Sequence, residues 1–148
     1  IRHAYAPGNG DPINFDLNDC STQRNLNEEG RKQAFDIRKS FKKHNIPIDK
    51  IISSDWCRCK ETASIAFNEK YKVKDFLNSF YEKRFSKNKK NQIKDLKKYV
   101  NNWKSNKNLI LVTHYVVISE LLNVYPSSGD IVISDKNYKV VGNLNSNF

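Results

Sequence analysis

Hydrophobic and polar positions recur along this chain with two different periods, and the changes of period divide it into predicted helices and strands. Apolar residues return every three or four positions over residues 28–43 and 91–104, which is the spacing of helices that bury one face. Residues 109–113 form a continuous apolar run that polar residues bound, a pattern typical of a strand buried on both faces. The chain therefore predicts a mixture of helices and at least one interior strand.

Shorter segments extend this pattern. They predict a strand at 48–53, helices at 56–68 and 115–123, and a terminal antiparallel hairpin formed by 130–134 and 138–141. Residues 53–55, Ser-Ser-Asp, offer N-caps for the first of these helices, and Asn27 offers one for the helix at 28–43. Residues 70–85 have apolar positions at mixed spacing and predict no single element. Residues 11–24 have neither period and indicate a long surface loop.

The length of 148 residues fits one domain over 1–148, because a chain of this size buries roughly two thirds of its surface on folding. The expected architecture is an α/β domain with a mostly parallel central sheet and helices on both faces. No apolar run approaches the roughly 20 residues that span a bilayer, so we expect no membrane partner. The expected location is soluble: cytoplasmic or, if a signal peptide has been removed, periplasmic or secreted.

The net charge of +10 predicts attraction to anions. Residues 83–107 hold ten Lys or Arg and one acidic residue, mostly within a predicted helix. A solvated helix face is the commoner reason for such a run, so nucleic acid is not the expected partner. A basic nucleic-acid-binding module stays as an alternative that depends on charge alone, and small phosphorylated molecules are the other class of anion.

Arginine and histidine side chains stand where the predicted strands end. Arg2 and His3 precede a loop rich in Gly, Pro and Asn, Arg58 lies in the first turn after the strand at 48–53, and His114 directly follows the strand at 109–113. The carboxyl ends of parallel strands lie along one edge of a sheet, so these side chains should converge. Guanidinium groups clamp phosphate oxygens and a neutral imidazole attacks phosphorus, and the combination therefore indicates phosphoryl transfer.

Four segments carry motifs in a fixed order. They are Arg2-His3-Ala4, similar to R-H-G with alanine in place of glycine; residues 26–34, similar to L-T-x-x-G-x-x-Q-A; residues 53–63, similar to S-S-x-L-x-R-A-x-x-T-A; and residues 112–114, V-T-H. Together they resemble the histidine phosphatase superfamily over most of the chain. Asn9 also falls at the spacing of the family's loop asparagine. The resemblance implies a three-layer sandwich of the phosphoglycerate mutase-like kind.

The resemblance also implies roles for these residues. His3 would attack phosphorus as a neutral imidazole and form a phosphohistidine that water hydrolyses, without a metal or any cofactor. Arg2, Arg58 and His114 would hold the phosphoryl group, with Asn9 assisting. A hydrogen bond at the other ring nitrogen should fix the tautomer of His3, and His114 should work protonated, helped by the anionic phosphate.

The general acid that protonates the leaving group is not assigned by the sequence. Members of the family place a carboxylate directly after the second histidine or in a Leu-x-Glu after the T-A helix, but Tyr115 follows His114 and Asn78 stands in the other place. Glu82 is nearby, and the opening loop offers Asp11, Asp16 and Asp19. A weak acid would favour substrates with good leaving groups, such as phosphohistidine or phosphoanhydrides.

The sequence therefore predicts a metal-independent histidine-type phosphohydrolase for phosphomonoesters, phosphohistidine or phosphoanhydrides. A catalytically weak or inactive phosphate-ligand binding protein of the same fold is the alternative. A mutase is less favoured, because the short chain leaves little material for a lid that excludes water.

The three cysteines allow at most one disulfide, because their number is odd. Cys57 and Cys59 are too close to bridge easily, so Cys20 should pair with one of them in an oxidising compartment. A zinc site from Cys57, Cys59 and a histidine is not expected, because two thiols at the start of one helix point in different directions.

Overall fold

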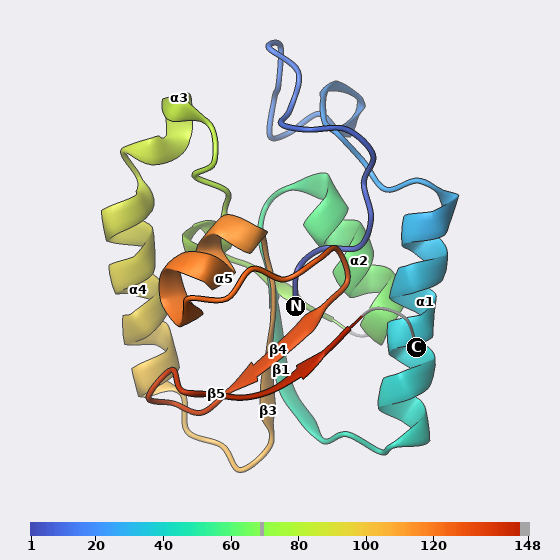
Figure 1. Ribbon diagram of the computed structural model, residues 1–148, viewed down its shortest axis with the longest axis vertical. Helices are drawn as coiled ribbons and strands as arrows, with labels where there is room; N and C mark the ends of the chain where they lie inside the picture. Colours follow the sequence, from blue (N-terminus) through green and yellow to red (C-terminus); the bar gives the residue numbers. More distant parts are fainter. Residues whose placement is uncertain (69, 146–148) are drawn as a thin grey trace.

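The computed structural model describes residues 1–68 and 70–145 (Figure 1). In chain order the elements are the 3-10 helix η1 (Cys20–Thr22), α1 (Glu28–Lys43), β1 (Ile48–Ser53), α2 (Cys57–Phe67), β2 (Lys72–Val73), the 3-10 helix η2 (Asp75–Leu77), α3 (Lys83–Ser86), α4 (Lys89–Asn102), β3 (Asn108–Val112), α5 (Tyr115–Leu122), β4 (Ile131–Ser134) and β5 (Val140–Leu144). The predicted helices and strands are confirmed to within about two residues at most ends. The segment that predicted no single element contains β2, η2 and the first three residues of α3.

The central sheet is parallel, with the strand order β2-β1-β3. Its register aligns Ile52 of β1 with Leu111 of β3 and with Lys72 of β2. Strands β4 and β5 form a separate antiparallel pair, the predicted terminal hairpin. The α/β class and the parallel sheet are thus confirmed.

Helices pack on both faces of the parallel sheet, because neighbouring strand residues point in opposite directions. Ile51 of β1 belongs to a buried cluster with Ile37 of α1 and Ala63 of α2. The next residue, Ile52, belongs to a second cluster with Leu96 of α4 and Val117 of α5. None of the helices in the described part of the chain is both long and apolar enough to cross a bilayer.

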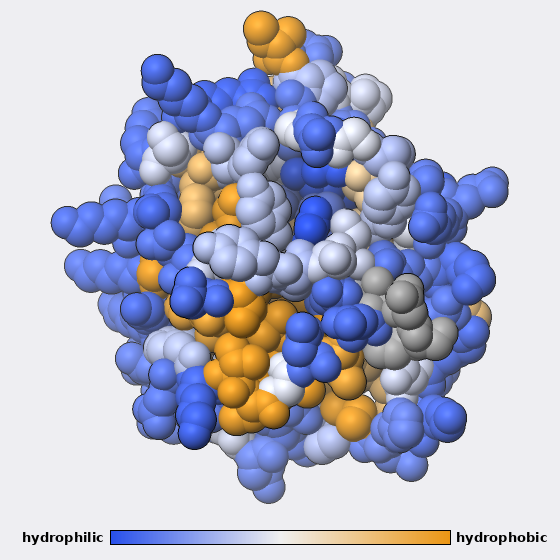
Figure 2. All heavy atoms as spheres, viewed as in Figure 1, coloured by the Kyte–Doolittle hydropathy of each residue, from blue (hydrophilic) through white to orange (hydrophobic). Residues whose placement is uncertain are grey.

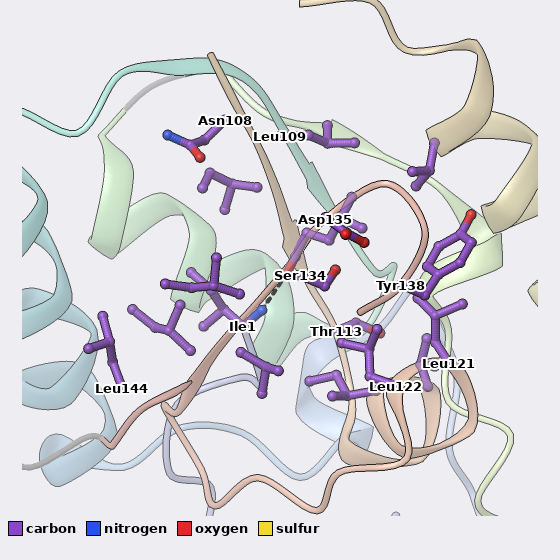
Figure 3. Close-up of a pocket in the computed structure, with 18 of the residues that line it drawn as sticks. Ile1, Asn108, Leu109, Thr113, Leu121, Leu122, Ser134, Asp135, Tyr138 and Leu144 are labelled. Atoms are coloured by element: carbon purple, nitrogen blue, oxygen red, sulfur yellow. Dashed lines mark hydrogen bonds between the residues drawn. The ribbon is translucent and has the colours of Figure 1, made fainter. Parts of the chain in front are cut away.

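An apolar groove lies between β3 and the β4–β5 hairpin, and it leaves one face of β3 less buried than the sequence predicts. Leu109 and Leu111 are only partly buried, so β3 is not buried on both faces as its sequence predicts. They border a cavity of about 610 Å³, whose lining includes Leu121 and Tyr138 (Figure 3). Figure 2 shows apolar side chains gathered on this face of the molecule, around α5 and the hairpin.

The caps of α1 and α2 differ in how well the sequence predicts them. The Asn27 side chain accepts a hydrogen bond from the Gly30 amide at 2.9 Å, as expected. Helix α2 instead begins after Trp56, whose side chain makes no capping hydrogen bond, so the prediction of a cap at residues 53–55 is wrong. The reason is a tertiary contact: the Ser54 hydroxyl and the Asp55 carboxylate are both hydrogen-bonded to the Asn78 side chain.

Gly30 lets the segment after His3 cross α1 in close contact. A β-carbon at position 30 would lie 2.0 Å from the Tyr5 carbonyl oxygen, so no other residue fits without moving that segment. The Tyr5 amide also donates to Gln33 Oε1 at 2.9 Å. Helix α1 therefore holds the backbone two residues beyond His3.

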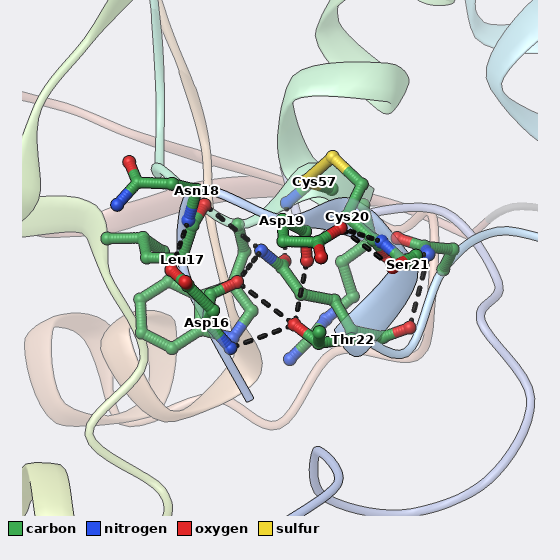
Figure 4. The surroundings of a disulfide bond; sticks show 12 residues. Asp16, Leu17, Asn18, Asp19, Cys20, Ser21, Thr22 and Cys57 are labelled. Carbon is green, nitrogen blue, oxygen red and sulfur yellow. Dashed lines mark hydrogen bonds between the residues drawn. A yellow bond between two sulfur atoms is a disulfide. The ribbon is translucent and has the colours of Figure 1, made fainter. Parts of the chain in front are cut away.

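A disulfide joins the long opening loop to the start of α2 (Figure 4). Cys20 pairs with Cys57, with their Cα atoms 5.7 Å apart, and Cys59 is a buried free thiol. Gln23 strengthens the same junction, because its Oε1 accepts from the Cys57 amide at 2.9 Å. The predicted pairing of Cys20 with one of the other two cysteines agrees with this bond.

We expect the Cys20–Cys57 bond to contribute about 4 kcal/mol to the free energy of unfolding, the chain-entropy value for a loop of 37 residues. Chemical denaturation of the oxidised protein and of a Cys20→Ser/Cys57→Ser variant measures the difference. Reductant should lower the stability of the wild type and leave the variant unchanged. Equal stability of the oxidised wild type and the variant would contradict the expectation.

Candidate active site

Six side chains that the sequence singles out lie around one cavity of about 710 Å³ beyond the carboxyl ends of β1 and β3. They are Arg2, His3, Asn9, Arg58, Glu82 and His114. We call this space the His3 cavity. The structure thus brings together residues that lie up to 112 positions apart, counted from Arg2 to His114, as the parallel topology predicts.

Backbone pairing sets the two histidines beside each other. Arg2 forms a parallel bridge with Thr113, directly after β3. The His3 amide donates to the Thr113 carbonyl and the Thr113 amide donates to the Ile1 carbonyl, both at 2.9 Å. The ring centroids of His3 and His114 are consequently 5.4 Å apart, and both residues are only 2% exposed.

The hydrogen bonds of His3 define its tautomer. Nδ1 lies 2.8 Å from the Ala4 carbonyl oxygen, which can only accept, so Nδ1 carries the proton. Nε2 is then the basic nitrogen, and Arg58 Nε donates to it at 3.2 Å. Burial, followed by the positive charge of Arg58, holds the pKa of His3 well below its ordinary value of 6.5. The ring is therefore neutral, with a lone pair on Nε2.

His114 is the N-cap residue of α5, and it contacts one residue directly after β1 and one residue of α2. Its Nε2 lies 3.0 Å from Ser54 Oγ and 3.5 Å from Cys59 Sγ. Burial first, then the Arg58 charge, lower the pKa of His114 well below 6.5. His114 is thus neutral in the free site, and the expectation that it works protonated depends on the negative charge of a bound phosphate.

The arginines differ in how many of their donors are already used. Arg58, only 3% exposed, forms an ion pair with Asp11 at 2.8 Å. Arg2 Nη1 donates to the Pro126 carbonyl at 2.9 Å, while its guanidinium carbon lies 5.3 Å from the centre of the Tyr115 ring. Arg2 Nε is buried and has no hydrogen-bond partner among the described residues. A buried donor without an acceptor suits an anionic ligand.

Of the carboxylates that the sequence offers as general acids, Glu82 and Asp11 line the cavity. Glu82 Oε1 accepts from the Asp11 amide at 2.8 Å and Oε2 pairs with Arg84 at 2.7 Å, so Glu82 is fixed at the cavity wall. Burial opposes ionisation of Asp11, but hydrogen bonds and charge from Arg58 outweigh it and lower its pKa, which makes Asp11 a poor proton donor. Asp16 and Asp19 bond within their own loop and do not line the cavity.

Several residues that line the cavity are not marked by any pattern in the sequence. Arg24 lines the cavity and donates through Nε to the Gly10 carbonyl at 2.9 Å and through Nη1 to the Ala6 carbonyl. Tyr81 and Tyr125 lie at its rim and are exposed. These side chains reach the cavity from irregular segments, where no period or motif marks them. The one available signal was the place of Arg24 at the end of the long loop.

The arrangement suits capture of an oxyanion followed by nucleophilic attack. Guanidinium donors surround a neutral imidazole nitrogen inside a cavity that also has room for a group larger than phosphate. Developing charge on phosphoryl oxygens would face Arg2 and Arg58 in a buried setting, where electrostatic interactions are stronger than in water.

Comparison with known proteins agrees with this chemistry at the level of the family. A family model described as the histidine phosphatase superfamily (branch 1) matches residues 1–109. No curated protein matches the chain significantly. Similar solved structures, by contrast, span nearly the whole chain.

Three of these structures illustrate the likeness. The protein histidine phosphatase SixA complexed with tungstate is 16% identical, with 99% of this chain and 94% of that one covered and a TM-score of 0.64. A phosphoglycerate mutase from Thermus thermophilus is 16% identical, with 97% and 95% covered and a TM-score of 0.66. A phosphoserine phosphatase mutant from Entamoeba histolytica in complex with phosphoserine is 19% identical, with 99% and 95% covered and a TM-score of 0.63. At these identities the likeness shows the phosphoglycerate mutase-like fold alone.

We expect acid to destabilise the protein partly through His3 and His114. The unfolded chain binds protons at these residues near pH 6.5 and the folded chain does not, so the free energy of unfolding is lost as the pH falls below 6.5. Within that window each histidine contributes a slope of about 1.4 kcal/mol per pH unit. Denaturation of the wild type and of His3→Asn between pH 7.5 and 5 measures it, and the variant should have the shallower slope. Equal slopes would show that His3 titrates normally in the folded state.

Proposed function

This chain belongs to the histidine phosphatase superfamily, and from that premise we propose that it is a phosphohydrolase acting through a phosphohistidine on His3. The substrate is a small phosphorylated molecule: a phosphomonoester or, with a better leaving group, phosphohistidine or a phosphoanhydride. The reaction needs no metal, because the arginines supply the positive charge. A phosphate-binding protein without turnover remains the alternative that the experiments below test.

The observation that carries the proposal is the state of His3. A neutral ring with its proton fixed on Nδ1 directs the Nε2 lone pair into a cavity that guanidinium groups line. In the free site Arg58 Nε–H donates to that lone pair at 3.2 Å. A phosphoryl oxygen would take over this N–H, which frees the lone pair only when a substrate is bound.

The chemistry then has two steps. In the first, His3 Nε2 forms a bond to phosphorus as the bond to the leaving oxygen breaks, and that oxygen takes a proton from a general acid. In the second, water attacks phosphorus, the bond from phosphorus to His3 Nε2 breaks as phosphate leaves, and the proton of the water passes to the carboxylate that the first step formed. Arg2 Nε, which lacks a partner in the described part of the chain, would donate to a phosphoryl oxygen throughout, and Asn9, which lines the cavity, would assist from the loop.

Glu82 is the carboxylate that we propose as the general acid. It lines the His3 cavity, and the Asp11 amide and Arg84 hold it in place. Of the carboxylates in the opening loop, Asp16 and Asp19 lie outside the cavity and Asp11 stays ionised. Both Glu82 oxygens already have partners, so one of them would have to give up its partner in order to carry the proton. An acid with this handicap suits substrates whose leaving groups need little protonation.

Turnover of an aryl phosphate should persist in a metal chelator and be abolished in His3→Ala. Brief incubation with a ³²P-labelled substrate should leave an acid-labile, alkali-stable label on His3 in the wild type only. His44→Ala, which changes an exposed histidine of the same chain, is the control and should retain both activity and label. The opposite result is a wild type that neither hydrolyses nor becomes labelled by any substrate, anhydrides and phosphohistidine included. That result would contradict the phosphohydrolase and favour the phosphate-binding protein.

Glu82→Gln should impair substrates according to their leaving groups. Hydrolysis of an alkyl phosphate should fall by roughly 10²- to 10⁴-fold, the usual contribution of a general acid, while an aryl phosphate should change little. Glu61→Gln, which alters an acidic residue paired with Arg31 outside the cavity, serves as the control. Equal losses for both substrates would assign Glu82 a structural role instead.

A further inference from the structure

Asp11 and Arg58 form an ion pair inside the wall of the His3 cavity. Both side chains are only 4% exposed. Asp11 Oδ1 accepts from Arg58 Nη1 at 2.8 Å and Oδ2 accepts from Nη2 at 3.1 Å. Oδ1 also accepts from the Arg24 amide at 3.1 Å, and Oδ2 from Trp56 Nε1 at 3.0 Å. Each carboxylate oxygen thus accepts two hydrogen bonds, and the carboxylate is locked in one orientation.

This contact determines which edge of the Arg58 guanidinium is free. The group is planar with five N–H bonds in a fixed fork. Asp11 occupies the end formed by Nη1 and Nη2, and the second Nη1 hydrogen points to the Arg24 carbonyl at 3.3 Å. The remaining edge consists of Nε–H, which donates to His3 Nε2, and the second Nη2 hydrogen, which has no acceptor among the described residues. Two parallel N–H bonds beside the nucleophile match two oxygens of one phosphoryl group.

The ion pair is a poor way to gain stability. Taking both charges out of water is costly, and apolar residues of similar volume often stabilise a protein as well or better. Its location at the nucleophile instead indicates a role in the chemistry. The two partners are also joined at a second point, because the Cys20–Cys57 bond links the loop that carries Asp11 to the residue that precedes Arg58.

We propose that Asp11 is a positioning residue, which holds the guanidinium of Arg58 so that its Nε–Nη2 edge faces His3 Nε2 and the incoming phosphoryl group. This inference rests on the proposed function only for its catalytic consequence. Asp11 itself does not touch the reacting atoms. Without it, the long Arg58 side chain would adopt several orientations, and few of them would present both donors to one phosphate.

Asp11→Asn and Asp11→Glu test the proposal, and Asp19→Asn is the matched control. Asp19 belongs to the same loop but is exposed, and its carboxylate accepts hydrogen bonds only from Ser21 among the described residues. Both Asp11 variants should lower kcat/KM for an aryl phosphate by roughly 10- to 100-fold, as is usual when the partner that orients an active group is removed. They should also raise the Kd for tungstate, a phosphate-like oxyanion, in calorimetry. Asp19→Asn should change neither value.

Whether the effect of Asp11→Asn depends on the presence of Arg58 distinguishes a positioning role from general damage to the fold. In an Arg58→Ala background, Asp11→Asn should have no further effect on the Kd for tungstate, because the group that it orients is gone. An equal loss with and without Arg58 would overturn the proposal. So would tighter tungstate binding in Asp11→Asn, which would make Asp11 a competitor of the anion, or unchanged binding and activity in both Asp11 variants. If Asp11→Asn does not fold, Asp11→Glu serves as the test, because the longer side chain keeps the negative charge but moves the carboxylate relative to Arg58.

Tungstate binding also separates this inference from the proposed function. Binding requires no turnover, so an inactive wild type that binds tungstate would refute the phosphohydrolase and still allow the Asp11 comparison. Conversely, an active enzyme with a labelled His3 and unaffected Asp11 variants would refute the positioning role alone. A wild type that does not bind tungstate would overturn the assignment of Arg58 as an anion ligand and the role of Asp11 with it.

Discussion

The parallel pairing of residues 1–3 with the end of β3 is the interaction on which the site depends. Through it the His3 amide reaches the Thr113 carbonyl, and the two histidines meet although more than one hundred residues separate them. The same short segment also reaches the start of β4, because the Arg2 amide donates to the Asp130 carbonyl at 3.1 Å. A few backbone hydrogen bonds thus align the nucleophile with the parallel sheet on one side and with the terminal hairpin on the other.

A second constraint is electrostatic. The site has to concentrate guanidinium groups around two imidazoles, and the same charges that would hold a phosphate help burial to keep both rings neutral. For His3 this is useful, because a protonated ring cannot attack. The buried carboxylate of Asp11 compensates part of the positive charge, and it does so at the end of Arg58 that points away from His3. Charge balance and orientation are therefore achieved by one residue.

The sequence predicted what local patterns encode and missed what tertiary contacts decide. The helix at 28–43, its Asn27 cap and the strand before His114 follow from periodicity and capping chemistry, and the family model confirms the resemblance that four motifs carried. The predicted N-cap of α2 was wrong because the side chains of Ser54 and Asp55 are hydrogen-bonded to Asn78 instead. The partner of Asp11 could not be read at all, because an ion pair between residues 47 positions apart leaves no trace in local spacing. For the same reason the sequence indicates Asp11 only as one of several candidate acids.

The burial of Cys59 has a consequence for the covalent chemistry of the chain. Its thiol lies two residues from Cys57, close enough in sequence to attack the Cys20–Cys57 bond, but exchange between thiols and disulfides proceeds through the thiolate. Burial raises the pKa of Cys59 to about 12, so the thiolate is almost absent at neutral pH in the folded protein. The native cysteine pairing is therefore protected kinetically as long as the core around Cys59 is intact, and scrambling becomes possible only when that core opens.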